Sequence, residues 1–158
     1  MTKEEEISAE LLAQFTSLEG KIRVQRARRI WVETDPEQFA AVFESLIERF
    51  LFKILCTITG QDEIESFSLM YHLGREDGTV ASLKTKILKT NVKWKSVGAR
   101  FPGAIIYERE IADLLGIQFE CLPPGPRYPL PDDWPEGQYP LRKDWQSADA
   151  LPKEGGGA

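Results

Sequence analysis

Apolar side chains recur at intervals of three and four residues after Asp35 and Pro36, and this is the clearest pattern in the chain. The apolar positions are Phe39, Val42, Phe43, Leu46, Ile47 and Phe50. Such spacing gives a helix with one wide apolar face, which we expect to pack on a sheet. Asp35 is the predicted N-cap, Pro36 suits the first turn, and Gln38 stands at the capping-box position. A second helix is predicted over residues 7–18, where apolar residues have helical spacing ahead of Gly20.

Four further segments alternate apolar and polar residues, the pattern of a strand with one buried face. They span residues 28–33, 53–59, 66–73 and 82–89. The last two are separated by Gly74 to Gly78, a strong turn signal that predicts an antiparallel hairpin. In the second segment Cys56 alternates with Ile54 and Ile58, so we expect a small core residue there rather than a reactive thiol.

A third helix is predicted over Tyr107–Leu115, and Gly116 closes it. The segment beyond is rich in proline, with Pro123, Pro124, Pro126, Pro129, Pro131, Pro135 and Pro140. Proline lacks a backbone donor and fixes φ, so this segment is expected to follow an extended path over another surface. Apolar and aromatic residues are spaced irregularly along it, which indicates docking on this domain or on a partner.

The order of these elements predicts an α+β fold with a mainly antiparallel sheet and helices packed on one side. We expect a compact domain over residues 1–118 and an extended proline-rich strap over residues 119–158. The strap is expected to end in a frayed tail, Gly155–Ala158. A length of 158 residues with 42% hydrophobic composition allows one sizeable core and not two.

The net charge of −5 argues against general binding to nucleic acid. The nearest approach to a basic patch consists of Arg23, Arg26, Arg28 and Arg29. No aromatic stacking platform interleaves these arginines, so a solvated strand edge or the rim of a partner contact is the favoured interpretation. The beginning of the chain is acidic with no apolar run behind it, and no stretch approaches the length of a membrane span. We therefore expect a chain that is cytoplasmic and soluble by itself.

Metal ligands are scarce. The two cysteines, Cys56 and Cys121, are far apart and form no CxxC pair, so neither a zinc ribbon nor an iron–sulfur cluster is expected within this chain. The only histidine, His72, lies in a predicted strand without a second histidine to help it. We expect it to be structural.

Three carboxylates, Glu108, Glu110 and Asp113, cluster with Arg109 at the third predicted helix. Clustered carboxylates can perform acid–base chemistry or bind a divalent cation. However, Arg109 and Asp113 are spaced to share one helix face, and carboxylates suit the positive end of a helix. A structural or docking role is therefore favoured over catalysis.

Two sequence motifs in the last third of the chain resemble those of a known family. The first is Glu108-Arg109-Glu110, Asp113, Leu114-Leu115, Gly116-Ile117 and Phe119; the second is Pro140-Leu141-Arg142-Lys143-Asp144-Trp145, with Asp132-Asp133-Trp134 between them. In this order they resemble the C subunit, or thirty-kilodalton subunit, of respiratory complex I and the related subunit of energy-converting membrane-bound hydrogenases. The lead-in Phe101–Ala104 is more similar to the hydrogenase-type branch, and Leu115 departs from the usual complex I pattern.

The resemblance implies a cofactor-free scaffold and assembly subunit in the peripheral arm of a membrane-bound complex I-like oxidoreductase, either a hydrogenase or an NADH or ferredoxin dehydrogenase. The implied partners are a large hydrogenase-like catalytic subunit and a small iron–sulfur subunit. Those partners would carry the iron–sulfur clusters and, in a hydrogenase, the NiFe centre. The chain would lie on the cytoplasmic face of the cell membrane, attached only through partner subunits, with residues 119–158 docked on a partner.

The residues expected to dock on partners are Glu108, Arg109, Glu110, Asp113, Gly116, Trp134, Pro140, Leu141, Arg142, Lys143, Asp144 and Trp145. For Arg142 we expect a bidentate contact with a carboxylate, flanked by Leu141 and Trp145 as buried anchors. The alternative is an independent small enzyme that uses Glu108, Glu110 and Asp113.

Overall fold

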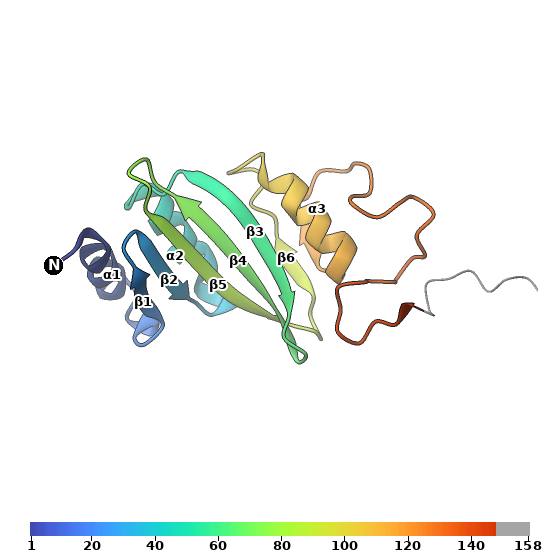
Figure 1. Ribbon diagram of the computed structural model, residues 1–158, viewed down its shortest axis with the longest axis horizontal. Coiled ribbons are helices and arrows are strands. Elements are labelled where there is room, and N and C mark those ends of the chain that lie inside the picture. Colours follow the sequence, from blue (N-terminus) through green and yellow to red (C-terminus); the bar gives the residue numbers. More distant parts are fainter. Residues whose placement is uncertain (148–158) are drawn as a thin grey trace, which may run out of the picture.

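The computed structural model describes residues 1–147, so the last part of the strap and the tail Gly155–Ala158 lie outside the described residues. Its centre is a five-stranded sheet with the order β1-β2-β5-β4-β3 (Figure 1). The strands are β1 (Ile22–Arg26), β2 (Arg29–Glu33), β3 (Ile54–Asp62), β4 (Ser66–Gly74) and β5 (Val80–Leu88). β2 and β5 are parallel, whereas the other neighbouring pairs are antiparallel. The predicted α+β fold with a mainly antiparallel sheet is confirmed.

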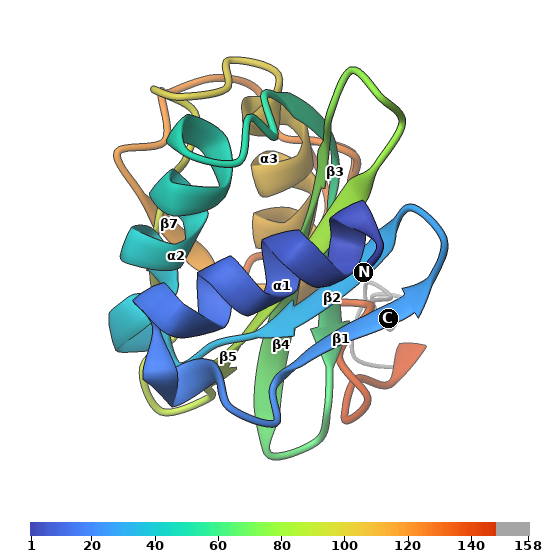
Figure 2. The ribbon, with the colours of Figure 1, turned by 90° about the vertical axis from the view of Figure 1, so that its left-hand side faces the viewer.

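The helices lie on one face of this sheet (Figure 2). They are α1 (Lys3–Gln14), α2 (Pro36–Glu48) and α3 (Ala104–Leu115), and a short 3-10 helix, Thr16–Leu18, follows α1. The apolar stripe predicted for α2 is buried against β4, where Phe39 packs on the ring of Tyr71. α3 approaches β3 closely at Gly60, where a Cβ atom would lie 2.9 Å from a methyl group of Leu115. Within residues 1–147, none of the helices has both the length and the apolar character needed to cross a membrane.

α1 begins and ends earlier than predicted, whereas α2 begins after Asp35 with Pro36 in its first turn, as predicted. α1 begins at Lys3 because Thr2 and Glu5 form a reciprocal capping box, in which each side chain accepts the backbone N–H of the other. At α2 no such box forms. Asp35 makes no side-chain cap and instead binds Lys21 at 2.9 Å, while Gln38 accepts the hydroxyl of Ser17.

Cys56 is exposed, so its expected place in the core is wrong. The register of β3 on β4 shifts between Leu55 and Thr57, which makes Cys56 the extra residue of a β-bulge. The bulge breaks the alternation along β3, so Ile58 faces the core whereas Ile54 is half exposed. A bulge cannot be read from the alternation alone because it depends on the partner strand.

Two short strands, β6 (Lys93–Lys95) and β7 (Gln118–Glu120), were not predicted and pair in parallel with each other. β7 follows α3 directly and crosses the domain boundary expected at residue 118. Trp94 of β6 donates its indole N–H to the hydroxyl of Tyr71 at 3.1 Å, which attaches this small sheet to the main core. The strap therefore leaves the domain from a strand that is itself fixed to the core.

Leu51 gives a direct test of backbone strain at the end of α2. It has φ of 62° and is 51% exposed, and the N–H of the next residue closes the helix by donating to the carbonyl of Leu46 at 3.0 Å. Glycine adopts this left-handed conformation at no steric cost, whereas leucine does not. We predict that Leu51→Gly raises the free energy of unfolding by roughly 0.5–1 kcal/mol, measured by urea titration. A lower stability for Leu51→Gly would show that burial of the remaining half of the side chain outweighs the strain.

Candidate partner-docking surface

Glu108 joins α3 to the loop after β6 from inside the core. Its side chain is fully buried, and its carboxylate accepts the hydroxyl of Ser96 at 2.5 Å and the N–H of Val97 at 2.8 Å. Burial raises the pKa of this carboxyl, while the two hydrogen bonds act in the opposite direction. Glu108 shares the buried face of α3 with Ile111 and Leu115, so its side chain is not exposed for the docking role expected of it.

Arg109 holds the proline-rich segment against α3. Its guanidinium donates to the carbonyls of Pro126 at 3.0 Å, Pro123 at 2.9 Å and Pro124 at 3.2 Å. A Cβ atom at Gly125 would lie only 1.9 Å from Nη1 of Arg109, so the loop closes around the guanidinium only with glycine at that position. Carbonyls in a proline-rich loop have few N–H partners nearby, and the guanidinium supplies the missing donors.

Asp113 repeats this arrangement one turn further along α3. Its carboxylate accepts Nε of Arg127 at 2.6 Å and the N–H of Leu130 at 2.9 Å. Arg127 also donates to the carbonyl of Trp134 at 2.8 Å, which extends the connection along the strap. Arg109 and Asp113 thus share a helix face as predicted, but each binds the strap instead of the other.

Arg142 fastens the end of the strap beside the C-terminus of α3. Its Nε donates to the carbonyl of Leu115 at 2.7 Å, and the guanidinium lies over the rings of Tyr139 and Phe67 at 4.4 and 5.2 Å. Gly116 has φ of 76°, and a Cβ atom there would lie 2.6 Å from Nη2 of Arg142. The bidentate contact of Arg142 with a carboxylate stays a prediction, while its Nε is bound to the carbonyl of its own chain.

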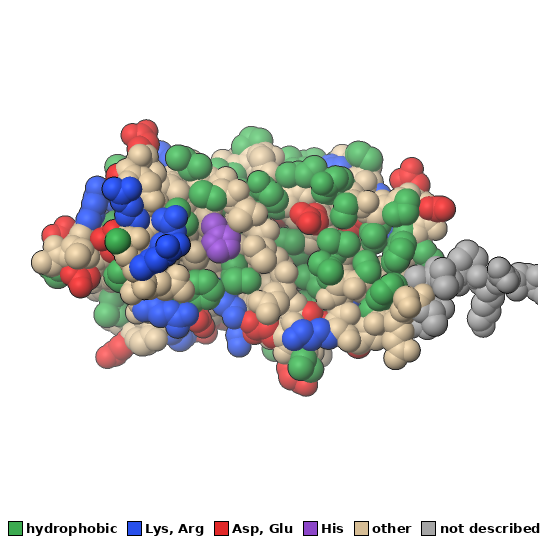
Figure 3. Space-filling model, viewed as in Figure 1, with side chains coloured by type: hydrophobic (Ala, Val, Ile, Leu, Met, Phe, Trp, Pro, Cys, Tyr) green, Lys and Arg blue, Asp and Glu red, His purple; other side chains and the backbone are tan. Residues whose placement is uncertain are grey.

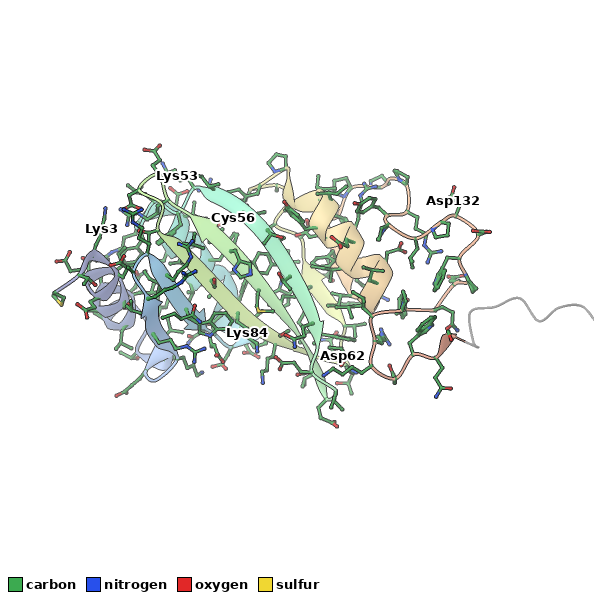
Figure 4. All side chains as sticks on the ribbon, viewed as in Figure 1. Lys3, Lys53, Cys56, Asp62, Lys84 and Asp132 are labelled. Carbon is green, nitrogen blue, oxygen red and sulfur yellow. The ribbon has the colours of Figure 1, made fainter. Side chains whose placement is uncertain are left out.

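Asp62, at the end of β3, ties the strap to the sheet (Figure 4). It is buried, and it accepts the N–H of Lys143 at 3.0 Å, Nζ of Lys89 at 2.8 Å and the N–H of Ile64 at 2.7 Å. Burial alone would raise the pKa of this carboxyl, but the three donors outweigh it and the net direction is downward. The ionised form is therefore the one that holds the strap.

The two tryptophans of the strap close on each other. The rings of Trp134 and Trp145 lie 6.0 Å apart, and both indole N–H groups donate to Gln138, one to its carbonyl and one to its side chain. Both tryptophans are half-buried by this arrangement. The described part of the strap thus packs on its own domain and on itself, one of the two possibilities that its composition left open.

An apolar surface remains exposed after these contacts are made. Ile106 of α3 is 47% exposed, and Tyr128 and Leu141 of the strap are 45% and 56% exposed. Ile106 and Tyr128 line a groove of about 400 Å³ between α3 and the strap, together with Pro102 and Ile105. Apolar side chains are numerous over this end of the molecule (Figure 3). We call this the strap surface, defined by Ile106, Tyr128 and Leu141.

The carboxylates of α3 do not form a shared chemical site. Glu108 is buried in the core, and Asp113 binds Arg127. Glu110 is half-buried. Across residues 1–147, no three His, Cys, Asp or Glu side chains gather in a way that could hold a metal ion. His72 lies on the sheet face away from the helices, where Nδ1 is 2.8 Å from the hydroxyl of Ser82. Burial lowers the pKa of His72. The arrangement around α3 supports binding of the strap rather than catalysis.

The fit of Gly125 around Arg109 can be tested with a matched pair of glycine variants. We predict that Gly125→Ala expels the guanidinium and lowers the free energy of unfolding by roughly 2 kcal/mol, since hydrogen bonds to a charged group are lost. The strap of this variant should also be cleaved faster in limited proteolysis. Gly103→Ala is the control, because φ there is −65° and a Cβ atom would meet no heavy atom within 4 Å. Equal behaviour of the two variants would rule out this role for Gly125.

Asp62 predicts a pH dependence with a defined sign. Because the folded pKa lies below the ordinary aspartate value of 3.8, the carboxylate stabilises the fold above that value, and this contribution is lost as the pH falls through the folded pKa. Asp62→Asn should therefore be less stable than the parent at pH 7, and the difference should shrink below about pH 4. Urea unfolding at pH 7, 5 and 3 measures it. Asp144→Asn, an exposed strap carboxylate, should show no such difference, and a constant gap for Asp62→Asn would contradict a charge effect.

The sequence matches a known family model, that of the respiratory-chain NADH dehydrogenase 30 Kd subunit, over residues 32–150. The C subunit of the F420H2 dehydrogenase of Methanosarcina mazei is 30% identical over 139 residues, which cover 86% of this chain and 87% of that protein. The beta subunit of the membrane-bound hydrogenase of Pyrococcus furiosus is 25% identical over 150 residues, or 91% of this chain and 87% of that protein. Formate hydrogenlyase subunit 5 of Escherichia coli is 36% identical over 95 residues, but these are only 17% of that longer protein.

Solved structures give the same result. A chain of the membrane-bound sulfane sulfur reductase, an archaeal respiratory membrane complex, has a TM-score of 0.80 and 27% identity, with 96% of this chain and 95% of that chain covered. A trypsin-resistant fragment of Nqo5 has a TM-score of 0.64 at 24% identity, covers 77% of this chain and 98% of the fragment, and supports the fold alone. The resemblance drawn from the motifs is confirmed. This chain belongs to the family of the thirty-kilodalton subunit of respiratory-chain NADH dehydrogenase, and it is a subunit of the complex I-like or membrane-bound hydrogenase type.

Proposed function

We propose that this chain is a cofactor-free scaffold subunit, which holds a large hydrogenase-like catalytic subunit and a small iron–sulfur subunit together. The observation that carries the proposal is the strap surface. Ile106, Tyr128 and Leu141 stay about half exposed although the segments that bear them are held firmly in place. Apolar side chains on a fixed surface are typical of a protein interface.

The strap contacts explain why this surface is suited to docking. Arg109, Asp113 and Arg142 hold the strap on α3 before any partner arrives. A surface that is already ordered loses little conformational entropy on binding, so more of the contact energy becomes affinity. We infer that these three residues act on partners indirectly, by positioning the strap.

Other expected docking residues fit around this surface. Lys143 and Asp144 are exposed at the end of the strap, while Glu110, Pro140, Trp134 and Trp145 are half-buried. We propose that they form the rim of the contact, where charged and polar groups add selectivity rather than affinity.

The lengths of relatives support the choice of the large subunit as partner. In the C/D subunit of the NADH-quinone oxidoreductase of Aeromonas hydrophila, the region similar to this chain makes up 13% of one long protein whose name joins C and D. Formate hydrogenlyase subunit 5 likewise contains the similar region as a small part. A domain that is joined to another subunit in one protein and separate in another is expected to lie beside that subunit in both. We therefore propose that the strap surface contacts the D-type subunit, which we take to be the large hydrogenase-like one.

The electron-carrying groups are proposed to lie in the partners. The whole chain has two cysteines and one histidine, too few to build a four-ligand iron–sulfur or zinc site from Cys and His alone. We propose that the chain lies at the cytoplasmic face of the membrane and is attached through its partners. Purified alone, it should contain no stoichiometric iron, nickel or flavin.

The strap surface can be tested with charged substitutions. We predict that Ile106→Asp combined with Tyr128→Asp leaves thermal unfolding of the isolated chain nearly unchanged, because both side chains are about half exposed. The same variant should lose at least about tenfold in recovery with the large subunit when the complex is purified in mild detergent, since a buried hot spot contributes about 2 kcal/mol or more.

Leu88→Asp is the control for this experiment, because Leu88 is exposed at the end of β5 and lies outside the strap surface. Its recovery with the large subunit should match that of the parent chain. Full recovery of the double variant would contradict docking through the strap surface, whatever the stability of the isolated chain.

A further inference from the structure

A second unusual surface lies at the end of the molecule opposite the strap. Basic side chains gather there at the start of α1, on the β1–β2 turn, on the β4–β5 turn and just before β3, with acidic side chains among them (Figure 3). They are Lys3, Arg26, Arg28, Arg29, Lys53 and Arg75. The two turns are joined by backbone hydrogen bonds, since the N–H of Val80 donates to the carbonyl of Arg28 at 3.0 Å. We call this cluster the basic end.

Most of these charges lack a carboxylate partner. Lys3 and Arg75 share Asp77, at 2.5 and 3.7 Å. In residues 1–147 the side chains of the other four, Arg26, Arg28, Arg29 and Lys53, form no ion pair. The one carboxylate bound at the β1–β2 turn in these residues is that of Glu4, which is buried and accepts the backbone N–H of Arg28 at 2.6 Å. In a chain with a net charge of −5 this is a local excess of positive charge. Such an excess attracts an acidic partner and repels a basic one.

The same end exposes apolar side chains. Leu51 and Ile54 are 51% and 50% exposed, and they line a hollow of about 340 Å³. Its rim has three cations, Lys3, Lys53 and Arg75, and two carboxylates, Glu76 and Asp77. An apolar floor with a charged rim is the arrangement of an interface core surrounded by polar groups. No aromatic ring lines the hollow, so it offers no stacking platform for bases.

The backbone conformation of Leu51 also indicates a contact at this end of the molecule. Its φ of 62° suits glycine, yet the chain has an exposed leucine there. The left-handed turn itself closes α2, but glycine would make the same turn without strain. Strained residues are concentrated at functional sites. The side chain of Leu51 is thus better explained by a contact outside this chain than by the packing of α2.

We propose that the basic end binds an acidic segment of a second partner protein, with an apolar side chain of that segment between Leu51 and Ile54. A lipid surface fits less well, because the apolar atoms line a hollow rather than a flat or protruding face. The inference goes beyond the proposed scaffold role, since it assigns a second interface at the far end of the molecule from the strap surface.

The test places a photoreactive benzoylphenylalanine at position 54 or, in a separate preparation, at position 128. Each chain is expressed in its own host, the complex is purified in mild detergent and irradiated, and crosslinked peptides are identified by mass spectrometry. Position 54 should crosslink to one protein subunit, within a few residues of Asp or Glu side chains. Position 128 should crosslink to the large subunit.

The two positions separate the two proposals. A crosslink at position 128 without one at position 54 overturns the basic-end proposal and leaves the strap surface standing. The reverse result overturns the strap surface alone. A crosslink from position 54 to lipid, to nucleic acid or to a segment without acidic residues also overturns the basic-end proposal.

A charge reversal tests the electrostatic part. Arg26→Glu with Lys53→Glu should lower the crosslink yield at position 54 by roughly tenfold. Lys53 lines the hollow, and Arg26 is an exposed member of the basic end. The matched control is Lys93→Glu with Lys95→Glu on β6, which should change the yield by less than about twofold. An unchanged yield in the Arg26 and Lys53 variant would overturn the proposal of an acidic partner segment.

Discussion

The contact between one guanidinium and three proline carbonyls fixes the start of the strap on α3. Proline carbonyls in an irregular segment lack neighbouring N–H groups, and Arg109 supplies donors to Pro123, Pro124 and Pro126. The arrangement has a cost, because Nε of Arg109 is buried without a partner. Arg109 also lines one side of the groove between α3 and the strap, so this contact helps to shape the groove.

Local patterns predicted the elements whose neighbours are close in sequence. The stripe of α2 and the β4–β5 hairpin follow from spacing and turn residues, which depend on neighbouring positions alone. The bulge at Cys56 and the parallel pairing of β2 with β5 depend on strands far away in sequence. β1 was missed as a separate strand because its side chains are nearly all exposed and do not alternate.

The candidate site shows a similar division. The motifs predicted that Arg109, Asp113 and Arg142 take part in docking, and in the structure they bind the strap to α3. Sequence could not tell whether a cation meets its own chain or a partner, because both contacts use the same chemistry. Gly125 could have been predicted as a contact position, because a glycine among prolines is typical of a place where another group approaches the backbone closely. In the structure that group is the guanidinium of Arg109.

The parallel pairing of β2 with β5 also has a consequence for the order of synthesis. β2 and α2 leave the ribosome early, but β5, the inner neighbour of β2, is complete only at Leu88. Until then β2 cannot join the hairpin of β3 and β4, and the sheet that covers the apolar stripe of α2 is incomplete. A pairing between segments distant in sequence forms slowly. The first half of the chain therefore leaves the ribosome with an apolar helix face that is not yet fully covered.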